Sequence, residues 1–137
     1  MKKQQGFTLI ELLVVIAIIG LLSTLAVVAL NNARMKSRDA KRVSDIKQIQ
    51  TALELYYNDA NAYPGSLGTT IASGTITYMS AVPTNPAPVN DGNCGTSATY
   101  TYTSASPNTT YTLQYCLGGV AGNVPGGTHT AYPGGIQ

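Results

Sequence analysis

An apolar run dominates the start of the chain. From Phe7 to Leu30 only four polar residues interrupt it, and Glu11 is the one charged residue among them. The run exceeds the roughly 20 residues that a helix needs to cross a bilayer core. A secretory signal peptide is the alternative, but its apolar core is typically about 7–15 residues and ends at a small-residue cleavage site. The length therefore predicts a stable membrane anchor.

Helical periodicity continues beyond this anchor. Apolar residues recur there at spacings of three and four, which is one stripe of an amphipathic helix. They are Val43, Ile46, Ile49, Leu53 and Tyr56. No proline or glycine occurs between Leu21 and Tyr63, and Asn61 and Pro64 then supply stop signals. We therefore expect one helix from about Phe7 to about Asn61.

After Pro64 the pattern changes to an alternation of period two, which predicts antiparallel strands with one apolar face. The alternating segments are 75–80, 98–103 and 110–117, and the tail 128–137 is expected to add an edge strand. The apolar face of the third segment consists of Tyr111, Leu113, Tyr115 and Leu117. The sequence thus predicts an α+β fold in which the second half of a long helix packs on a small antiparallel sheet.

Charge is scarce and unevenly placed. The eight basic residues all lie between Lys2 and Lys47, and Asp91 is the only charged residue after Asp59. A nucleic-acid-binding domain needs clustered Lys and Arg, so the neutral C-terminal half argues against that class. For the cluster from Arg34 to Arg42 we favour a solvated or headgroup-facing collar. The alternative is that these basic residues form salt bridges with Asp39, Asp45 or Asp59 of another copy of the chain.

Cys94 and Cys116 are the only cysteines. Because a membrane segment precedes them, a disulfide in an oxidising compartment is the natural interpretation. It closes a loop worth roughly 3 kcal/mol in the chain-entropy model. The alternative is two buried free thiols.

Catalytic patterns are lacking, and we expect a protein that is not an enzyme. His129 is the only histidine and has no Cys or carboxylate cluster beside it in sequence. The segment Asn90–Asn93 resembles a fragment of a calcium loop, yet one carboxylate is few for such a site. A turn rich in Asn, Asp and Gly is the simpler interpretation. We expect no cofactor and no resident metal.

Two features of the anchor stay unexplained by hydropathy. Lys and Arg are more numerous after the apolar run than before it, which by charge counting places the C-terminal side in the cytoplasm. The cysteines argue for the opposite orientation. Glu11 lies at bilayer depth, where a carboxylate usually has a partner and a function. Snorkelling to the headgroups is its plainer explanation.

The segment Gly6-Phe7-Thr8-Leu9-Ile10-Glu11-Leu12, between a short basic leader and a long apolar stretch, resembles the N-terminus of type IV pilins and pseudopilins. The resemblance implies that a prepilin peptidase cuts between Gly6 and Phe7, and that Phe7 is then N-methylated. It implies that Glu11 compensates the amine of Phe7 on a neighbouring copy during assembly. It also implies a cytoplasmic leader and an outer C-terminal module.

The same resemblance implies a lollipop architecture. Its parts are a cleaved leader at 1–6, a membrane or filament-core helix at 7–30, an amphipathic continuation at 31–62 and a β-rich module at 63–137. Many pilins have a proline late in the apolar helix, and this chain has none there. Gly20 is the candidate weak point instead.

Three functions fit these residues. The first is a subunit of an extracellular type IV pilus for adhesion, motility or DNA uptake. The second is the major pseudopilin of a type II secretion system, for which calcium becomes an option. The cysteine pair and the scarcity of acidic residues after Asp59 favour the first. The third is a membrane-anchored binding protein that never assembles.

The implied partners are copies of the chain in a helical filament, a prepilin peptidase, and an assembly platform with its ATPase. Nucleic acid is not an expected partner. The expected location is the bacterial inner membrane before assembly. After assembly it is an extracellular pilus, or a periplasmic pseudopilus under the second function.

Overall fold

The computed structural model describes residues 6–96 and 98–136. Lys2 and Lys3 of the expected leader lie outside the described residues. The chain divides into two compact units, 1–34 and 35–137, which are treated separately below.

One long helix, α1 (Leu9–Ala60), contains 52 residues, close to the predicted span. It ends where Asn61 adopts a φ of 54°, a left-handed conformation that Asn tolerates at a helix C-terminus. The Asn61 amide still donates to the Tyr57 carbonyl at 2.8 Å. In the first unit the apolar side chains of α1 are exposed, and the helix is long and apolar enough to cross a membrane.

Six strands form two antiparallel sheets. The strands are β1 (Ile71–Ser73), β2 (Ile76–Met79), β3 (Thr101–Ser104), β4 (Tyr111–Leu117), β5 (Gly127–Tyr132) and β6 (Gly135–Ile136). One sheet is the β1–β2 hairpin, and the other has the order β3-β4-β5-β6. The single predicted sheet is therefore wrong in one respect. Segment 75–80 pairs with β1, a strand that the pattern did not reveal, and stays out of the main sheet.

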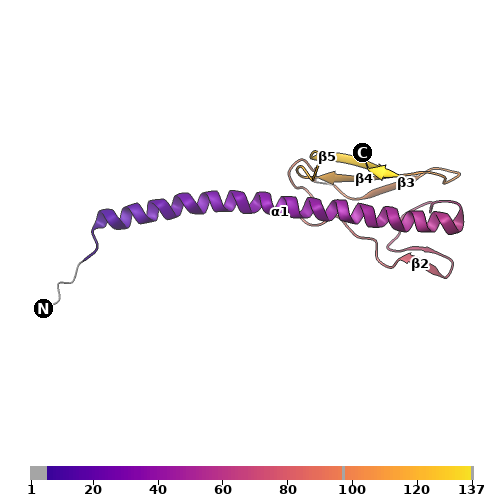
Figure 1. Cartoon of the computed structure of the whole chain (residues 1–137), viewed down its shortest axis with the longest axis horizontal. Helices are drawn as coiled ribbons and strands as arrows, with labels where there is room; N and C mark the ends of the chain where they lie inside the picture. Colours follow the sequence, from indigo (N-terminus) through magenta and orange to yellow (C-terminus); the bar gives the residue numbers. More distant parts are fainter. Residues whose placement is uncertain (1–5, 97, 137) are drawn as a thin grey trace. The chain divides into compact units, whose positions relative to one another are not determined.

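The tail also differs from its prediction. It supplies two strands, of which β5 pairs along most of β4 and β6 forms the edge. Figure 1 shows the larger sheet along one side of the second half of α1, with the β1–β2 hairpin near the end of that helix.

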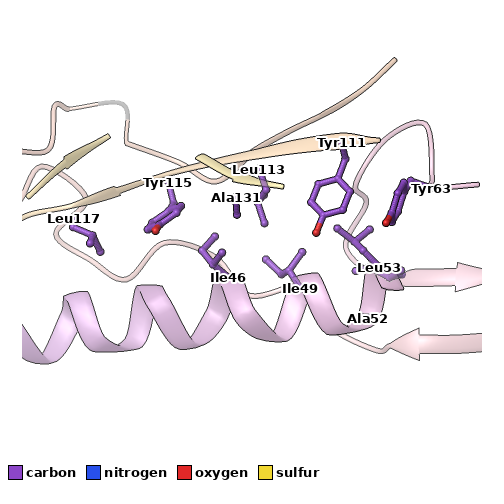
Figure 2. Packing of buried hydrophobic residues seen from close by; sticks show 11 residues of the cluster. Ile46, Ile49, Ala52, Leu53, Tyr63, Tyr111, Leu113, Tyr115, Leu117 and Ala131 are labelled. Carbon is purple, nitrogen blue, oxygen red and sulfur yellow. The ribbon is translucent and has the colours of Figure 1, made fainter. Parts of the chain in front are cut away.

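The core of the second unit lies between α1 and β4. Ile46, Ile49 and Leu53 of the predicted stripe are fully buried. They meet the inward face of β4, which is the predicted set Tyr111, Leu113, Tyr115 and Leu117, each at most 1% exposed. Figure 2 shows these two rows of side chains pointing toward one another. The α+β fold predicted from the sequence is thus confirmed.

Candidate functional site

The N-terminal motif places two of its key side chains at the start of α1. Phe7 is 85% exposed and precedes the helix. Thr8 and Glu11 bond each other reciprocally across the first turn. The Glu11 Oε2 accepts from the Thr8 amide at 2.8 Å and from the Thr8 hydroxyl at 2.5 Å, and the Glu11 amide donates back to Thr8 Oγ1 at 3.3 Å. This arrangement is a capping box.

The cap gives Glu11 a local role that the sequence analysis missed. The signal was present, because Thr-x-x-Glu before an apolar run is the sequence signature of such a box. Capping satisfies a backbone amide that the helix itself leaves unpaired. Among the described residues, no cationic group pairs with this carboxylate. The pairing of Glu11 with the Phe7 amine of another copy remains a prediction, as do cleavage after Gly6 and methylation of Phe7.

A second constellation lies in the compact unit 35–137, and we name it the arginine–aspartate cluster. It consists of Arg38, Asp39, Arg42, Asn85 and Asp91. Arg42 Nη1 donates to Asp39 Oδ1 at 2.6 Å, and both side chains are completely buried. Asp39 also accepts from two backbone amides, those of Gly118 and Gly119, each at 2.8 Å. The Asp39 carboxylate therefore has hydrogen-bond partners in place of water, as a buried charge requires.

The loop between β2 and β3 is fastened to α1 by the same cluster. Arg38 donates two hydrogen bonds to the Asp91 carboxylate, from Nε to Oδ2 at 2.5 Å and from Nη2 to Oδ1 at 2.9 Å. Hydrogen bonding from Arg38 holds the pKa of the Asp91 carboxyl below its usual value, and the same contact raises the pKa of Arg38. Arg42 adds a bond from its Nε to Asn85 Oδ1 at 2.8 Å. Bidentate Arg–carboxylate pairs combine strength with geometric specificity.

These contacts correct the predicted collar at two of its five basic residues, while Arg34, Lys36 and Lys41 are exposed. Arg42 is buried, and Arg38 bonds to Asp91 instead of lying free in solvent. Asp39 and Asp45 are at most 5% exposed, so neither is available for bridging between subunits. A sequence signal existed here too. Asp39 and Arg42 continue the spacing of Ile46 and Ile49, so they occupy the buried stripe, and their opposite charges lie three residues apart.

Glycines allow two loops to cross beside this cluster. The Asn93 amide donates to the Gly118 carbonyl at 2.9 Å. A Cβ added at Gly92, whose φ is +55°, would lie 2.1 Å from that same carbonyl oxygen. Cys94 and Cys116 form a disulfide next to this crossing, with their Cα atoms 5.7 Å apart. The predicted disulfide is thus present. It covalently joins the two segments next to the point where their loops cross.

Asp91 is the carboxylate that the sequence offered for calcium. Its two oxygens are bonded to Arg38, and Arg42 Nη1 lies 3.6 Å from Oδ2. Across residues 6–96 and 98–136, no group of three or more His, Cys, Asp or Glu residues is placed to hold a metal ion. In this structure the turn at Asp91 is held by arginine.

Tyrosine hydroxyls secure the remaining loops. The Tyr100 hydroxyl donates a hydrogen bond to Asp45 Oδ2 at 3.1 Å. The Tyr102 hydroxyl donates one to the Pro64 carbonyl at 2.7 Å. Burial is the main cause that raises the pKa of Tyr100. The rings also pack together, with Tyr63 and Tyr111 edge to face at 4.7 Å between centroids. The tyrosines thus serve the core and the loop contacts.

Comparisons with known proteins bear on the N-terminal motif first. The family model of the prokaryotic N-terminal methylation motif matches residues 1–27. The chain is 38% identical over 90 residues to type II secretion system core protein G of Vibrio cholerae, covering 66% of this chain and 58% of that protein. It is 47% identical over 62 residues to the protein of the same name from Escherichia coli K12, 45% of this chain and 43% of that one.

A protein with a different name is also similar. It is a probable minor fimbrial protein of Dichelobacter nodosus, 36% identical over 66 residues, which are 48% of this chain and 42% of that protein. The chain thus spans about half the length of these relatives. No solved structure matches the chain. The chain therefore has a prepilin-type N-terminus and is similar, over 45% to 66% of its length, to proteins named type II secretion system core protein G and probable minor fimbrial protein.

Proposed function

We propose that this chain is a filament-forming pseudopilin of a type II secretion system, the function that the sequence analysis kept as its alternative. The observation that carries the proposal is the set of relatives named type II secretion system core protein G, at 38% to 47% identity for the two described above. The main sequence-based choice, an extracellular pilus, has weaker support from these relatives.

A type IV pilus subunit stays the second candidate. The Cys94–Cys116 disulfide favours it, because the sequence resemblance links such a bridge with pilins. The fimbrial relative from Dichelobacter nodosus points the same way. Adhesion, motility and DNA uptake belong to this candidate alone.

The proposed assembly begins at the N-terminus. A prepilin peptidase hydrolyses the Gly6–Phe7 peptide bond, which frees the leader and exposes a new amine on Phe7. Methylation of that amine leaves it positively charged. Glu11 of another copy then pairs with it in the apolar filament core, where a paired carboxylate and ammonium cost far less than either one alone.

The proposed location follows from this order of events. The precursor lies in the inner membrane through the apolar part of α1. An assembly platform and its ATPase then extract it into a filament, which is periplasmic for a pseudopilus.

N-terminal sequencing of the protein purified from its cells tests the processing step. We expect N-methyl-Phe7 as the first residue. A mature protein that starts at Met1 would remove both filament candidates and leave the membrane-anchored binding protein.

Deletion of the chain separates the two filament candidates. For a pseudopilin, the deleted cells lose secretion of folded exoproteins, which then accumulate in the periplasm. For a pilus subunit, exoprotein secretion persists, and electron microscopy shows the loss of surface filaments. Intact secretion after deletion would therefore reject the pseudopilin proposal.

A further inference from the structure

Many charged side chains of the compact unit 35–137 form ion pairs within the unit. Arg38, Asp39, Arg42 and Asp91 neutralise one another within the arginine–aspartate cluster. Three exposed lysines are left over in the first half of this unit's helical segment, namely Lys36, Lys41 and Lys47. At the other end of the segment, Asp59 is the only exposed acidic side chain among the described residues of the unit. The uncompensated charges are thus separated along α1.

Two of these lysines border an apolar groove. The groove has a volume of about 790 Å³ and lies between α1, the 120–124 turn and β6. Lys36 and Lys47 are the charged residues of its lining, and Val43, Val120, Val124 and Ile136 are among its apolar ones. Val120 is 62% exposed. An apolar floor between two ammonium groups suits an apolar side chain that has a carboxylate beside it.

The last turns of α1 present that combination. Leu55 is 49% exposed, and Asp59 follows it by four residues, so both lie on one face of the helix. Asp59 also accepts a hydrogen bond from the Tyr78 hydroxyl at 2.6 Å, which fixes its position. The last turn of α1 contains no basic residue. The negative end of the helix dipole therefore adds to the charge of Asp59, and nothing in that turn opposes it.

We propose that the Lys36–Lys47 groove of one copy receives the Leu55–Asp59 face of a second copy of this chain. Leu55 covers the apolar floor, and Asp59 pairs with a groove lysine. The proposal rests on the filament function proposed above. The two faces differ, so the contact is heterologous and repeats without closing unless the rotation between copies brings it full circle. An open-ended contact of this kind is what a filament requires.

Helix geometry sets the stagger between the two copies. With parallel helices and a rise of about 1.5 Å per residue, pairing of Asp59 with Lys47 shifts the copies by about 18 Å, and pairing with Lys36 by about 35 Å. Either shift is a measurable feature of an assembled filament.

Charge reversal in the full chain, expressed in its own cells, tests the contact. Asp59→Lys and the double variant Lys36→Glu/Lys47→Glu are each expected to lower the fraction of subunit recovered in filaments roughly tenfold, because each places like charges together. Combining all three substitutions is expected to restore filaments. Lys41→Glu is the matched control, since Lys41 is an exposed lysine of the same helix outside the groove lining.

Cross-linking gives a second measurement that does not depend on charge. In filaments of a Leu55→Cys/Val120→Cys variant, a short bismaleimide is expected to give a ladder of covalent multimers, and each single variant only monomers or sparse dimers. The native disulfide does not react, because both of its sulfurs are bonded.

The outcomes separate the inference from the function. Wild-type filaments with no ladder, and with Asp59→Lys assembling normally, overturn the inference and leave the filament function standing. Failure of the triple variant to recover, together with an absent ladder, also overturns it. A processed wild-type chain that forms no filaments overturns the proposed function and the inference together.

Discussion

Asp39 shows how a charged residue becomes part of a core. Its carboxylate accepts from Arg42 and from the amides of Gly118 and Gly119, and none of its surface reaches solvent. Removing one partner of a buried ion pair leaves the other uncompensated, which costs more than the pair contributes when intact. The stability of the unit should therefore depend sharply on this residue.

We predict that Asp39→Ala lowers the free energy of unfolding by about 3–5 kcal/mol, because the buried Arg42 loses its closest counterion and keeps only Asp91, which Arg38 already binds. Lys41→Ala, two residues away and exposed, should change it by less than about 0.5 kcal/mol. Urea unfolding of the detergent-solubilised chain, followed by tyrosine signals, measures both. Equal effects from the two variants would contradict the buried-pair explanation.

Glu11 has two roles at the residue scale, a helix cap seen in the structure and a proposed charge pair with another copy. Glu11→Gln separates them, because Gln also completes a capping box but carries no charge. We expect both Glu11→Gln and Glu11→Ala to be cleaved and membrane-inserted, and both to fail in filament assembly. The measurement is the amount of subunit in sheared or pelleted filaments. Normal assembly of Glu11→Gln would leave capping as the sole role.

At the scale of elements, α1 and β4 hold the unit together through matching apolar faces. Leu53 is fully buried, whereas Leu55, two residues later, is 49% exposed. We predict that Leu53→Ala lowers the free energy of unfolding by about 2–5 kcal/mol through lost burial and a residual cavity. Leu55→Ala should leave it nearly unchanged. Thermal unfolding of the two variants tests the pair, and similar melting temperatures would argue against the packing described here.

The attachment of the β2–β3 loop to α1 predicts a pH dependence. Hydrogen bonding from Arg38 lowers the pKa of Asp91 in the folded state. A lowered folded pKa gives stability that is present above the unfolded value of about 3.9 and is lost as the pH falls through the folded value. Unfolding free energy should thus be steady from pH 7 to 5 and fall below about pH 4. Asp91→Asn should show a shallower fall, and an unchanged slope would contradict this contribution.

At the scale of the whole molecule, the sheets are small and the core of the unit 35–137 is thin, so a covalent cross-link is expected to matter for stability. The Cys94–Cys116 disulfide has a sequence separation of 22. We predict that the double variant Cys94→Ser/Cys116→Ser loses roughly 3 kcal/mol of unfolding free energy.

A chelator should leave the melting temperature of the wild type unchanged, because Asp91 is held by Arg38. A large calcium-dependent rise in melting temperature would contradict that view.

Sequence periodicity predicted most of the architecture. The spacing from Ile46 to Leu53 identified the buried face of α1, and the alternation from Tyr111 to Leu117 identified the inward face of β4. Both patterns are local, since the period of a helix or strand is set by its own backbone. The pairing of 75–80 with β1 escaped prediction because strand partners are chosen by contacts between distant segments.

The candidate sites also divide into those set by a local pattern and those set by contacts between distant segments. The sequence by itself determined the anchor, the prepilin-type motif and the two cysteines, because each is defined by residue types at fixed local spacing. Helical spacing places Asp39 and Arg42 on the buried stripe, but only the tertiary structure decided which partners the charged side chains meet. Arg38 and Arg42 looked like a solvated collar until Asp91 and Asn85, 53 and 43 residues away, were brought against them. A charge is buried or exposed according to its partners, and a linear pattern does not contain them.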